Sequence, residues 1–242
     1  MSKIAITAGW DDVPHLGEAE KQALLLSYPP HMRDARTRGV PRMGAGAIYP
    51  VPESEFVCTP LPLQPHWPRV GGLDVGWNVT AALWGALDRD TQQVYIYAEH
   101  YRGKAEVAIH ASAIRARGSW VPMAIDPAAR GRSQADGRAL YDQYEAEGLN
   151  LLLADNALES GIYRVWSMLS EGRIKIFSTC SNLLAEMRIY RRDERGNIVK
   201  SANHACDALR YLSGALGDAV LEPHKEIGKR WCDWRPPRHF YG

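Results

Sequence analysis

Asp74 is the first residue whose position could support chemistry. It lies in the run GLDVGW, in the middle of a predicted strand. An ionised carboxylate inside a sheet is costly unless it is paired with a cation or holds a metal ion. Gly71, Gly72 and Gly76 around it would let a ligand or a nucleic-acid backbone approach closely. A salt-bridged aspartate at a strand end and a functional aspartate both fit this position.

Two further aspartates stand at the ends of predicted strands. Asp126 follows PMAI and Asp155 follows LLLA, both at the carboxyl edge where α/β sheets usually place their sites. Aspartate is also a common first residue of turns, so each position alone is weak evidence. Together with Asp74, these carboxylates on neighbouring strands favour a functional site.

Asp207 lies in NHACDALRYLSGAL, whose periodicity predicts a helix. Projection of this helix places Ala205, Leu209, Leu212 and Leu216 on one side. Asp207 lies almost opposite them, and its neighbours on that side are Asn203, His204, Arg210, Tyr211 and Gly214. A solvated face is the ordinary explanation of this pattern. A face that lines an open cleft produces the same pattern, and periodicity does not choose between the two.

The elements that must position these residues form an α/β pattern. The runs RVGGLDVGW, TAALWGALD and QQVYIYAEHY predict a three-stranded antiparallel meander. Beyond it, strands are predicted at 120–127, 149–155 and 174–180, and helices at 104–118, 135–148, 157–172, 181–192 and 203–216. Ser181 or Asn182 is expected to cap its helix, and a hairpin turn is expected near Gly196 and Asn197. This order predicts a mixed β-sheet flanked by helices.

The two ends of the chain differ from this central part. Residues 1–55 hold a short predicted strand and helix and then many prolines and glycines, which suits a linker or a packed-down arm. Arg33, Arg36, Arg38 and Arg42 make this arm basic, and either a solvated arm or one that faces DNA explains them. Residues 56–220 form the predicted main domain, and residues 221–242 a basic, loosely held tail.

Composition excludes several classes of protein. The chain has 242 residues, 45% of them hydrophobic and 24% charged, with a net charge of +1, which does not by itself indicate a nucleic-acid binder. No apolar run approaches the roughly 18 residues of a membrane span, and the first residues do not resemble a signal peptide, so a soluble intracellular protein is expected. The sequence contains no GxSxG motif, so it gives no support to a serine hydrolase. The cysteines are widely spaced and predicted to be free thiols: Cys58, Cys180, Cys206 and Cys232.

Five segments, in this order, resemble the phage terminase large subunit: ITAGWDDVPHL, YPPHMRDARTRGVPRMGAGAIYPV, GLDVGW, AIDPAARGRS and NHACDALRYL. The resemblance covers nearly the whole chain and is weakest in the C-terminal tail. The elements GLDxG and NHAxDALRY are fairly specific jointly. The resemblance implies an RNase H-like nuclease domain with three acidic metal ligands, which correspond here to Asp74, Asp126 and Asp207.

The chemistry that the resemblance implies is cleavage of double-stranded DNA with two Mg²⁺ or Mn²⁺ ions, roughly 4 Å apart. Such hard ions select oxygen ligands, and an all-aspartate set disfavours zinc. Asp74 is expected to bridge the ions, with Asp126 and Asp207 on either side. Asp155 ranks second, as an outer ligand. His204, one turn before Asp207, could orient a water or a phosphate, or be structural.

Four basic residues could contact DNA phosphates, although ordinary surface charge explains each equally well: Arg130, Arg132, Arg195 and Lys200. The resemblance also implies a portal protein and a terminase small subunit as partners, in the cytoplasm of an infected bacterium. Residues 1–55 resemble the end of the motor domain of the family. Since no GxxxxGK[ST] loop occurs in the sequence, we expect a C-terminal fragment or split-gene product that does not hydrolyse ATP.

Two other functions remain compatible with these residues. Another nuclease of RNase H-like fold, such as a junction resolvase or a transposase-like enzyme, would share the metal chemistry and differ in substrate. A non-catalytic module that binds DNA or a portal ring would use the basic segments without cutting.

Overall fold

The computed structural model describes residues 10, 17–27, 37, 46–131, 139–193, 196–199 and 202–223. The strands are β1 (Val57–Cys58), β2 (Arg69–Asp74), β3 (Thr80–Asp88), β4 (Gln93–Arg102), β5 (Met123–Ile125), β6 (Leu151–Leu153) and β7 (Ile174–Phe177). The helices are α1 (Glu18–Ser27), α3 (Glu53–Phe56), α4 (Val107–Arg115), α5 (Leu140–Ala146), α6 (Leu158–Ser170), α7 (Ser181–Ile189) and α8 (His204–Gly214). Two short 3-10 helices are η2 (Pro127–Arg130) and η3 (Leu216–Asp218).

The seven strands form one mixed sheet in the order β1-β7-β4-β3-β2-β5-β6. Strands β2, β3 and β4 are antiparallel neighbours, as the predicted meander requires. Strands β5 and β6 continue the sheet in parallel beyond β2, and β7 and β1 continue it in parallel beyond β4. The prediction of a mixed sheet is therefore confirmed, and β2 lies inside it, between β3 and β5.

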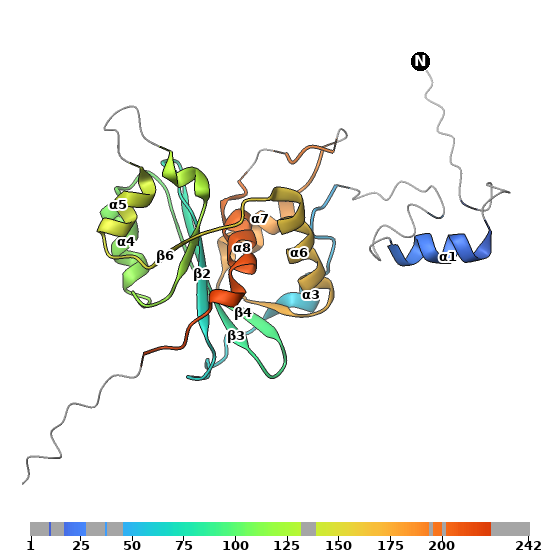
Figure 1. Ribbon diagram of the computed structural model, residues 1–242, viewed down its shortest axis with the longest axis horizontal. Helices are drawn as coiled ribbons and strands as arrows, with labels where there is room; N and C mark the ends of the chain where they lie inside the picture. Colours follow the sequence, from blue (N-terminus) through green and yellow to red (C-terminus); the bar gives the residue numbers. More distant parts are fainter. Residues whose placement is uncertain are drawn as a thin grey trace, which may run out of the picture.

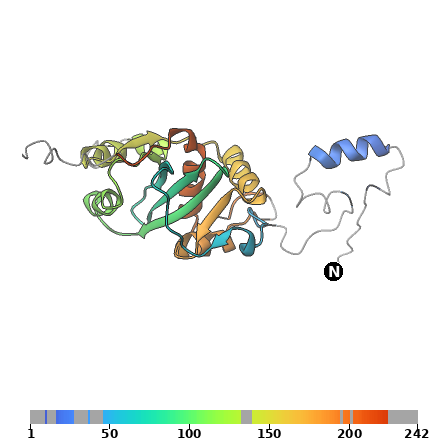
Figure 2. The same ribbon diagram turned by 90° about the horizontal axis from the view of Figure 1, so that it is seen from below.

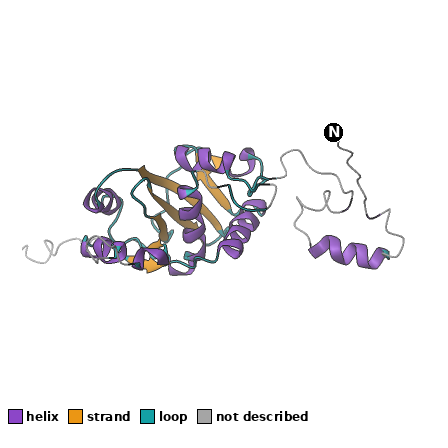
Figure 3. Cartoon of the chain, turned by 90° about the horizontal axis from the view of Figure 1, so that it is seen from above, coloured by secondary structure: helices purple, strands orange, loops and turns teal. Residues whose placement is uncertain are grey.

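Helices cover both faces of this sheet (Figures 1, 2 and 3). Helices α6, α7 and α8 pack on one face and contribute Val165, Leu183 and Leu209 to a buried core. Helices α4 and α5 pack on the other face, where Ile114 and Tyr144 are buried. The side chains of β3 alternate between the two cores because successive residues of a strand point to opposite faces.

Helix α8 lies directly against β2, and glycine makes this possible. A Cβ atom added to Gly72 would overlap the carbonyl oxygen of Ala208 in α8, and one added to Gly71 would overlap the side chain of Met123. The interpretation that these two glycines leave space for a ligand is therefore wrong, because the protein itself fills that space. Their role is to bring α8 and β5 close to the strand that carries Asp74.

The face of α8 that holds Asp207 is not a solvated surface. Arg210 and Tyr211, which the projection placed beside Asp207, are buried, as are Ala208 and Leu209 on the other side of the helix. The ordinary explanation of the periodicity is thus wrong. The helix packs on α6 and α7 as well as on the sheet, and the side chain of Asp207 is only 18% exposed.

Helix α7 begins differently from the prediction. Its N-cap is Cys180, and no side-chain capping bond is made by that residue. Instead, the carboxylate of Glu99 on β4 accepts hydrogen bonds from the backbone N–H groups of Asn182 and Leu183, at 2.9 and 3.0 Å. The prediction that Ser181 or Asn182 caps this helix is wrong because a residue from a neighbouring strand takes that place.

Two short elements lie where the sequence indicated only a proline-rich stretch. Helix α3 and strand β1 were not predicted, and β1 pairs in parallel with β7. Ile48 and Tyr49 are buried in the core that lies under α6, α7 and α8. Packed residues therefore precede position 56, although the division of the chain at residue 55 itself stays a prediction.

Other expectations concern smaller features. The hairpin turn is present, with the Asp193 N–H donating to the Asn197 carbonyl oxygen at 2.8 Å and Gly196 at a φ of +82°. Cys58, Cys180 and Cys206 are free thiols, as predicted, and Cys232 lies outside the described residues. Within the described ranges no helix has both the length and the apolar character that crossing a membrane requires.

Candidate metal and nuclease site

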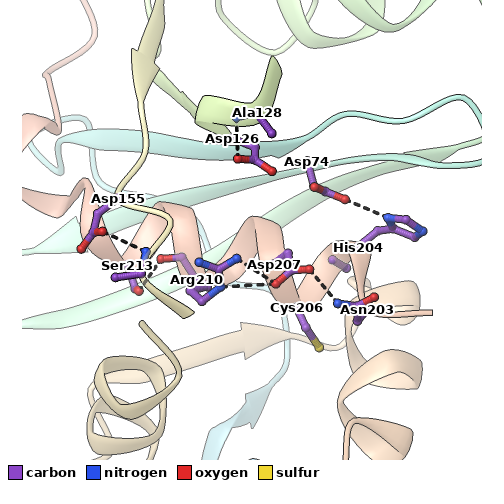
Figure 4. Close-up of polar contacts among 12 residues, drawn as sticks. Asp74, Asp126, Ala128, Asp155, Asn203, His204, Cys206, Asp207, Arg210 and Ser213 are labelled. Carbon is purple, nitrogen blue, oxygen red and sulfur yellow. Dashed lines mark hydrogen bonds and ion pairs between the residues drawn. The ribbon is translucent and has the colours of Figure 1, made fainter. Parts of the chain in front are cut away.

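Asp74 and Asp126 lie at the ends of two adjacent parallel strands. Leu73 of β2 pairs with Ile125 of β5; Asp74 is the last residue of β2, and Asp126 is the residue that follows β5. Pro127 follows Asp126 and begins η2, whose first turn Asp126 caps by accepting a hydrogen bond from the Ala128 N–H at 2.9 Å. The sheet register therefore places the two carboxylates at one edge (Figure 4).

Asp207 reaches the same region from α8, which packs on both β2 and β5. Figure 4 shows its side chain below those of Asp74 and Asp126. The charges of all three aspartates act on the buried phenol of Tyr211 and raise its pKa, after the larger effect of burial. Three carboxylates that are far apart in the sequence are thus gathered around one end of β2.

His204, the first residue of α8, holds Asp74. Its Nδ1 donates a hydrogen bond to Oδ2 of Asp74 at 2.8 Å. This bond raises the pKa of His204 above its ordinary value, against the opposing effect of burial. The side chain of Asp74 is 15% exposed and that of His204 is 33% exposed. The pair therefore lies at the border between the core and solvent, where a substrate could reach it.

Asp207 is held by two side chains of its own helix region. Asn203 donates to its Oδ2 at 2.7 Å, and the Nε and Nη2 atoms of Arg210 approach its Oδ1 at 3.3 and 3.1 Å. Burial raises the pKa of Asp207, Arg210 opposes this shift, and the charge of Asp74 adds to it. A partly buried carboxylate beside another carboxylate is an environment that favours the binding of a cation.

The donor atoms fit a hard divalent ion by type, since they are carboxylate oxygens. Among the described residues, none donates a hydrogen bond to the second oxygen of Asp74 or of Asp126. As the side chains are placed, however, no three His, Cys, Asp or Glu residues of the described ranges are close enough to enclose an ion. Oδ2 of Asp207 accepts from Asn203 alone among the described residues, so the second lone pair of that oxygen is available to an ion.

Asp155 is engaged elsewhere. It follows β6, and its Oδ1 accepts a hydrogen bond from the Ala157 N–H at 3.0 Å, while Oδ2 lies 3.5 Å from Arg164 of α6. The bond from the Ala157 N–H, and after it Arg164, lower the pKa of Asp155. Figure 4 shows its carboxylate to the side of the other three. The structure thus gives Asp155 a local role in the β6–α6 connection.

Of the predicted phosphate contacts, only Arg130 is described. It lies on η2, four residues after Asp126, and its guanidinium stands over the ring of Tyr141 at 5.0 Å from the centroid. Its position beside Asp126 is compatible with contact to DNA. Arg132, Arg195 and Lys200 lie outside the described residues, as do Arg33, Arg36, Arg38 and Arg42 of the predicted basic arm.

Sequence reasoning missed residues that support the aspartates. Arg210 and Asn203 were noted only as neighbours of Asp207 on the helix, although their spacing of three and four residues from it is the spacing at which helical side chains meet. Glu186 of α7 is buried and bonded to the start of α8. No local sequence signal marks it, because its partners are far along the chain.

Comparison with known proteins identifies the family of the chain. A family model described as the terminase RNaseH-like domain matches residues 71–214. The terminase large subunits of Enterobacteria phage LP7 and Salmonella phage P22 are each 33% identical to the chain over 211 residues. These matches cover 83% of this chain but only 44% and 42% of those subunits, so the chain spans less than half of their length.

Solved structures give the same result. The nuclease domain of the P22 large terminase superposes with a TM-score of 0.68 and 29% identity, over 74% of this chain and 97% of that domain. The large terminase nuclease of thermophilic phage G20c with bound magnesium has a TM-score of 0.54 and 17% identity, over 72% of this chain and 98% of that one, and shows the fold alone. The predicted RNase H-like fold is confirmed. The resemblance first seen in GLDVGW and NHACDALRYL holds, and the chain belongs to the family of phage terminase RNase H-like domains, the nuclease part of terminase large subunits.

Proposed function

We propose that this chain is a divalent-metal-dependent endonuclease that cuts double-stranded DNA during the packaging of viral genomes. The observation that supports the proposal is the placement of Asp74 and Asp126 at the ends of the paired strands β2 and β5, with α8, which carries Asp207, packed on both strands, in the fold of the P22 nuclease domain. Bound magnesium in the nuclease of phage G20c supports the choice of ion. The proposed partners are double-stranded DNA, a portal protein, a terminase small subunit and a motor domain.

The three aspartates would hold the ions, with Asp74 between Asp126 and Asp207. Two Mg²⁺ or Mn²⁺ ions supply a water of lowered pKa and stabilise the charge that develops on the phosphate. Neighbouring side chains of the chain would hold these carboxylates in position to bind the ions. His204 fixes the rotamer of Asp74 through the bond at 2.8 Å, and Asn203 and Arg210 fix that of Asp207.

Burial contributes a second effect. Asp207 and Tyr211 lie in a region from which water is largely excluded, and this raises the pKa of both groups. A carboxylate that is poorly hydrated attracts a cation more strongly than an exposed one does, because less water must be displaced. Arg130 on η2 would then grip a phosphate next to Asp126 without reading a base.

The test is a plasmid cleavage assay with Mn²⁺ and with Mg²⁺. The unaltered chain should nick and linearise supercoiled plasmid, and chelation of the metal should stop it. Asp74→Asn and Asp207→Asn should lower the rate by at least about a hundredfold, since each removes a ligand. Asp218→Asn, which changes an exposed carboxylate just beyond α8, is the matched control and should cut normally.

Each other result identifies an alternative. A strict preference for four-way junctions over ordinary duplex would favour a resolvase-like enzyme. Cleavage that persists unchanged in the Asp74 and Asp207 variants would point to a contaminating nuclease and leave the chain as a binding module. Measurable ATP turnover would contradict the expectation, drawn from the missing phosphate loop, that the chain is no ATPase.

A further inference from the structure

Glu186 is a buried carboxylate that the proposed chemistry does not use. It lies on α7 and is 3% exposed. Its Oε2 accepts hydrogen bonds from the N–H groups of Ala205 and Cys206 at 2.7 and 3.1 Å, and its Oε1 accepts one from the Tyr101 hydroxyl at 2.7 Å. Glu186 thus joins β4, α7 and the first turn of α8.

The first turn of a helix has N–H groups without partners inside the helix, and a residue such as asparagine at the N-cap ordinarily satisfies one of them. The N-cap of α8 is Asn203, yet its side chain makes no capping bond. Its amide donates instead to Oδ2 of Asp207 at 2.7 Å. Glu186 supplies the acceptor that Asn203 does not.

We propose that Glu186 is a positioning residue for the metal site: by capping α8 from α7, it leaves the amide of Asn203 to hold Asp207. The inference rests on the proposed function, because it assigns Asp207 to the metal site. Glu186 touches none of the three aspartates in the bonds described, and it acts through the helix and through Asn203.

The fold contains a matched control for this role. Glu99 of β4 caps α7 in the same manner, through the N–H groups of Asn182 and Leu183, and also accepts from the Asn182 side chain at 2.8 Å. Both residues are carboxylates that cap a helix from a neighbouring element. Only Glu186 caps the helix that carries Asp207, so loss of Glu99 should affect stability more than metal binding.

The experiment measures Mn²⁺ binding by titration calorimetry on the full chain, and cleavage rates with varied DNA. In Glu186→Ala, the side chain of Asn203 is expected to turn its Oδ1 to the N–H groups at the start of α8 and to leave Asp207. The dissociation constant for Mn²⁺ should then rise about tenfold or more. The kcat should fall while KM for DNA stays unchanged. Glu186→Gln retains an oxygen acceptor and should show a smaller loss, and Tyr101→Phe, which removes a single bond, a smaller loss still.

Glu99→Ala should bind Mn²⁺ as the unaltered chain does, even if its thermal stability falls as far as that of Glu186→Ala. Equal Mn²⁺ affinity in Glu186→Ala and the unaltered chain would overturn the positioning role, as would equal losses in the Glu186 and Glu99 variants. If Glu186→Ala does not fold, Glu186→Gln and Tyr101→Phe decide the question in the same way.

A readout without metal separates this inference from the proposed function. The side-chain amide signals of Asn203 in ¹H–¹⁵N spectra report its bond to Asp207, and they should move in Glu186→Ala but not in Glu99→Ala. If the unaltered chain binds no Mn²⁺ while these signals move as expected, the proposed function fails and the role of Glu186 in placing Asp207 stands. If the signals do not move, the role of Glu186 fails by itself.

Discussion

The imidazole of His204 and the carboxylate of Asp74 are 2.8 Å apart, although 130 residues separate them in the sequence. This bond links the first residue of α8 to the last residue of β2. Among the described residues it is the side-chain hydrogen bond that joins the helix carrying Asp207 to the strand ending in Asp74, in addition to the close packing of the two elements.

Replacing His204 with alanine should weaken the site more than the fold. The loss of a bond that orients a ligand typically lowers metal affinity or activity by about 10- to 100-fold, and we expect a value in this range for plasmid cleavage and for Mn²⁺ affinity. The thermal stability should change little, because a third of the His204 side chain is exposed. His66→Ala, at an exposed histidine, is the control. Normal cleavage by His204→Ala would show that Asp74 needs no support from the histidine.

Arg210 should contribute to stability through its bond to Asp207. The side chains are 5% and 18% exposed, so Arg210→Met leaves a largely buried carboxylate without its cation. Loss of one partner of such a pair typically lowers the free energy of unfolding by about 3–5 kcal/mol. The double variant Arg210→Met with Asp207→Asn should recover much of this loss in urea denaturation. Strictly additive effects of the two substitutions would mean that the pair is not coupled.

Gly72→Ala should separate α8 from β2. The added methyl group would overlap the Ala208 carbonyl oxygen, which is backbone and cannot move aside without moving the helix. Overpacking of this kind typically lowers the free energy of unfolding by about 1–3 kcal/mol, and Mn²⁺ affinity should fall with it as Asp207 is displaced. Gly217→Ala is the control, because a Cβ at that position meets no atom within 4 Å. Equal stability of the two variants would contradict the close approach.

The histidine pair on the opposite face of the sheet should make stability depend on pH. His100 Nε2 and His110 Nδ1 are 2.9 Å apart, and burial, with His110, Arg117 and Arg102 nearby, lowers the pKa of His100 to about 4. The unfolded chain takes up this proton near its ordinary value of about 6.5, whereas the folded chain resists it. The contribution to stability is therefore fully present above pH 6.5 and is lost as the pH falls toward 4.

The expected loss over this window is on the order of 2 kcal/mol, after allowance for the partial exposure of His100. Urea denaturation at several pH values measures it. In His100→Gln the free energy of unfolding should vary less between pH 6.5 and 4.5 than in the unaltered chain. Parallel curves for the two proteins would exclude the histidine pair as the cause.

The sequence was sufficient for the strands and helices that have strong periodicity. The meander of β2, β3 and β4, the later strands and the helices from α4 to α8 could be predicted because each buries a regular apolar pattern. Helix α3 and strand β1 could not, since they are short and lie among prolines. Strand β1 is defined by its pairing with β7, a contact over more than a hundred residues that no local pattern records.

The residues of the candidate site could also be predicted only in part. Asp126 and Asp155 have the same local signature, a carboxylate after an apolar strand, but only the tertiary structure shows that Asp155 is turned to α6 while Asp126 stands beside Asp74. The glycines near Asp74 suggested room for a ligand because sequence cannot show what fills the space. Glu186 and Glu99 cap helices from other elements, so the rules for local capping could not find them.

Among the described residues, helix α8 is the last long element, and it brings Asp207 to strands that are synthesised much earlier. A nascent chain emerging from the ribosome carries Asp74 and Asp126 well before it carries Asp207. Such an intermediate lacks one third of the proposed ligand set and also lacks the histidine that orients Asp74. The complete set of proposed ligands therefore exists only in a chain that has been synthesised and folded through α8.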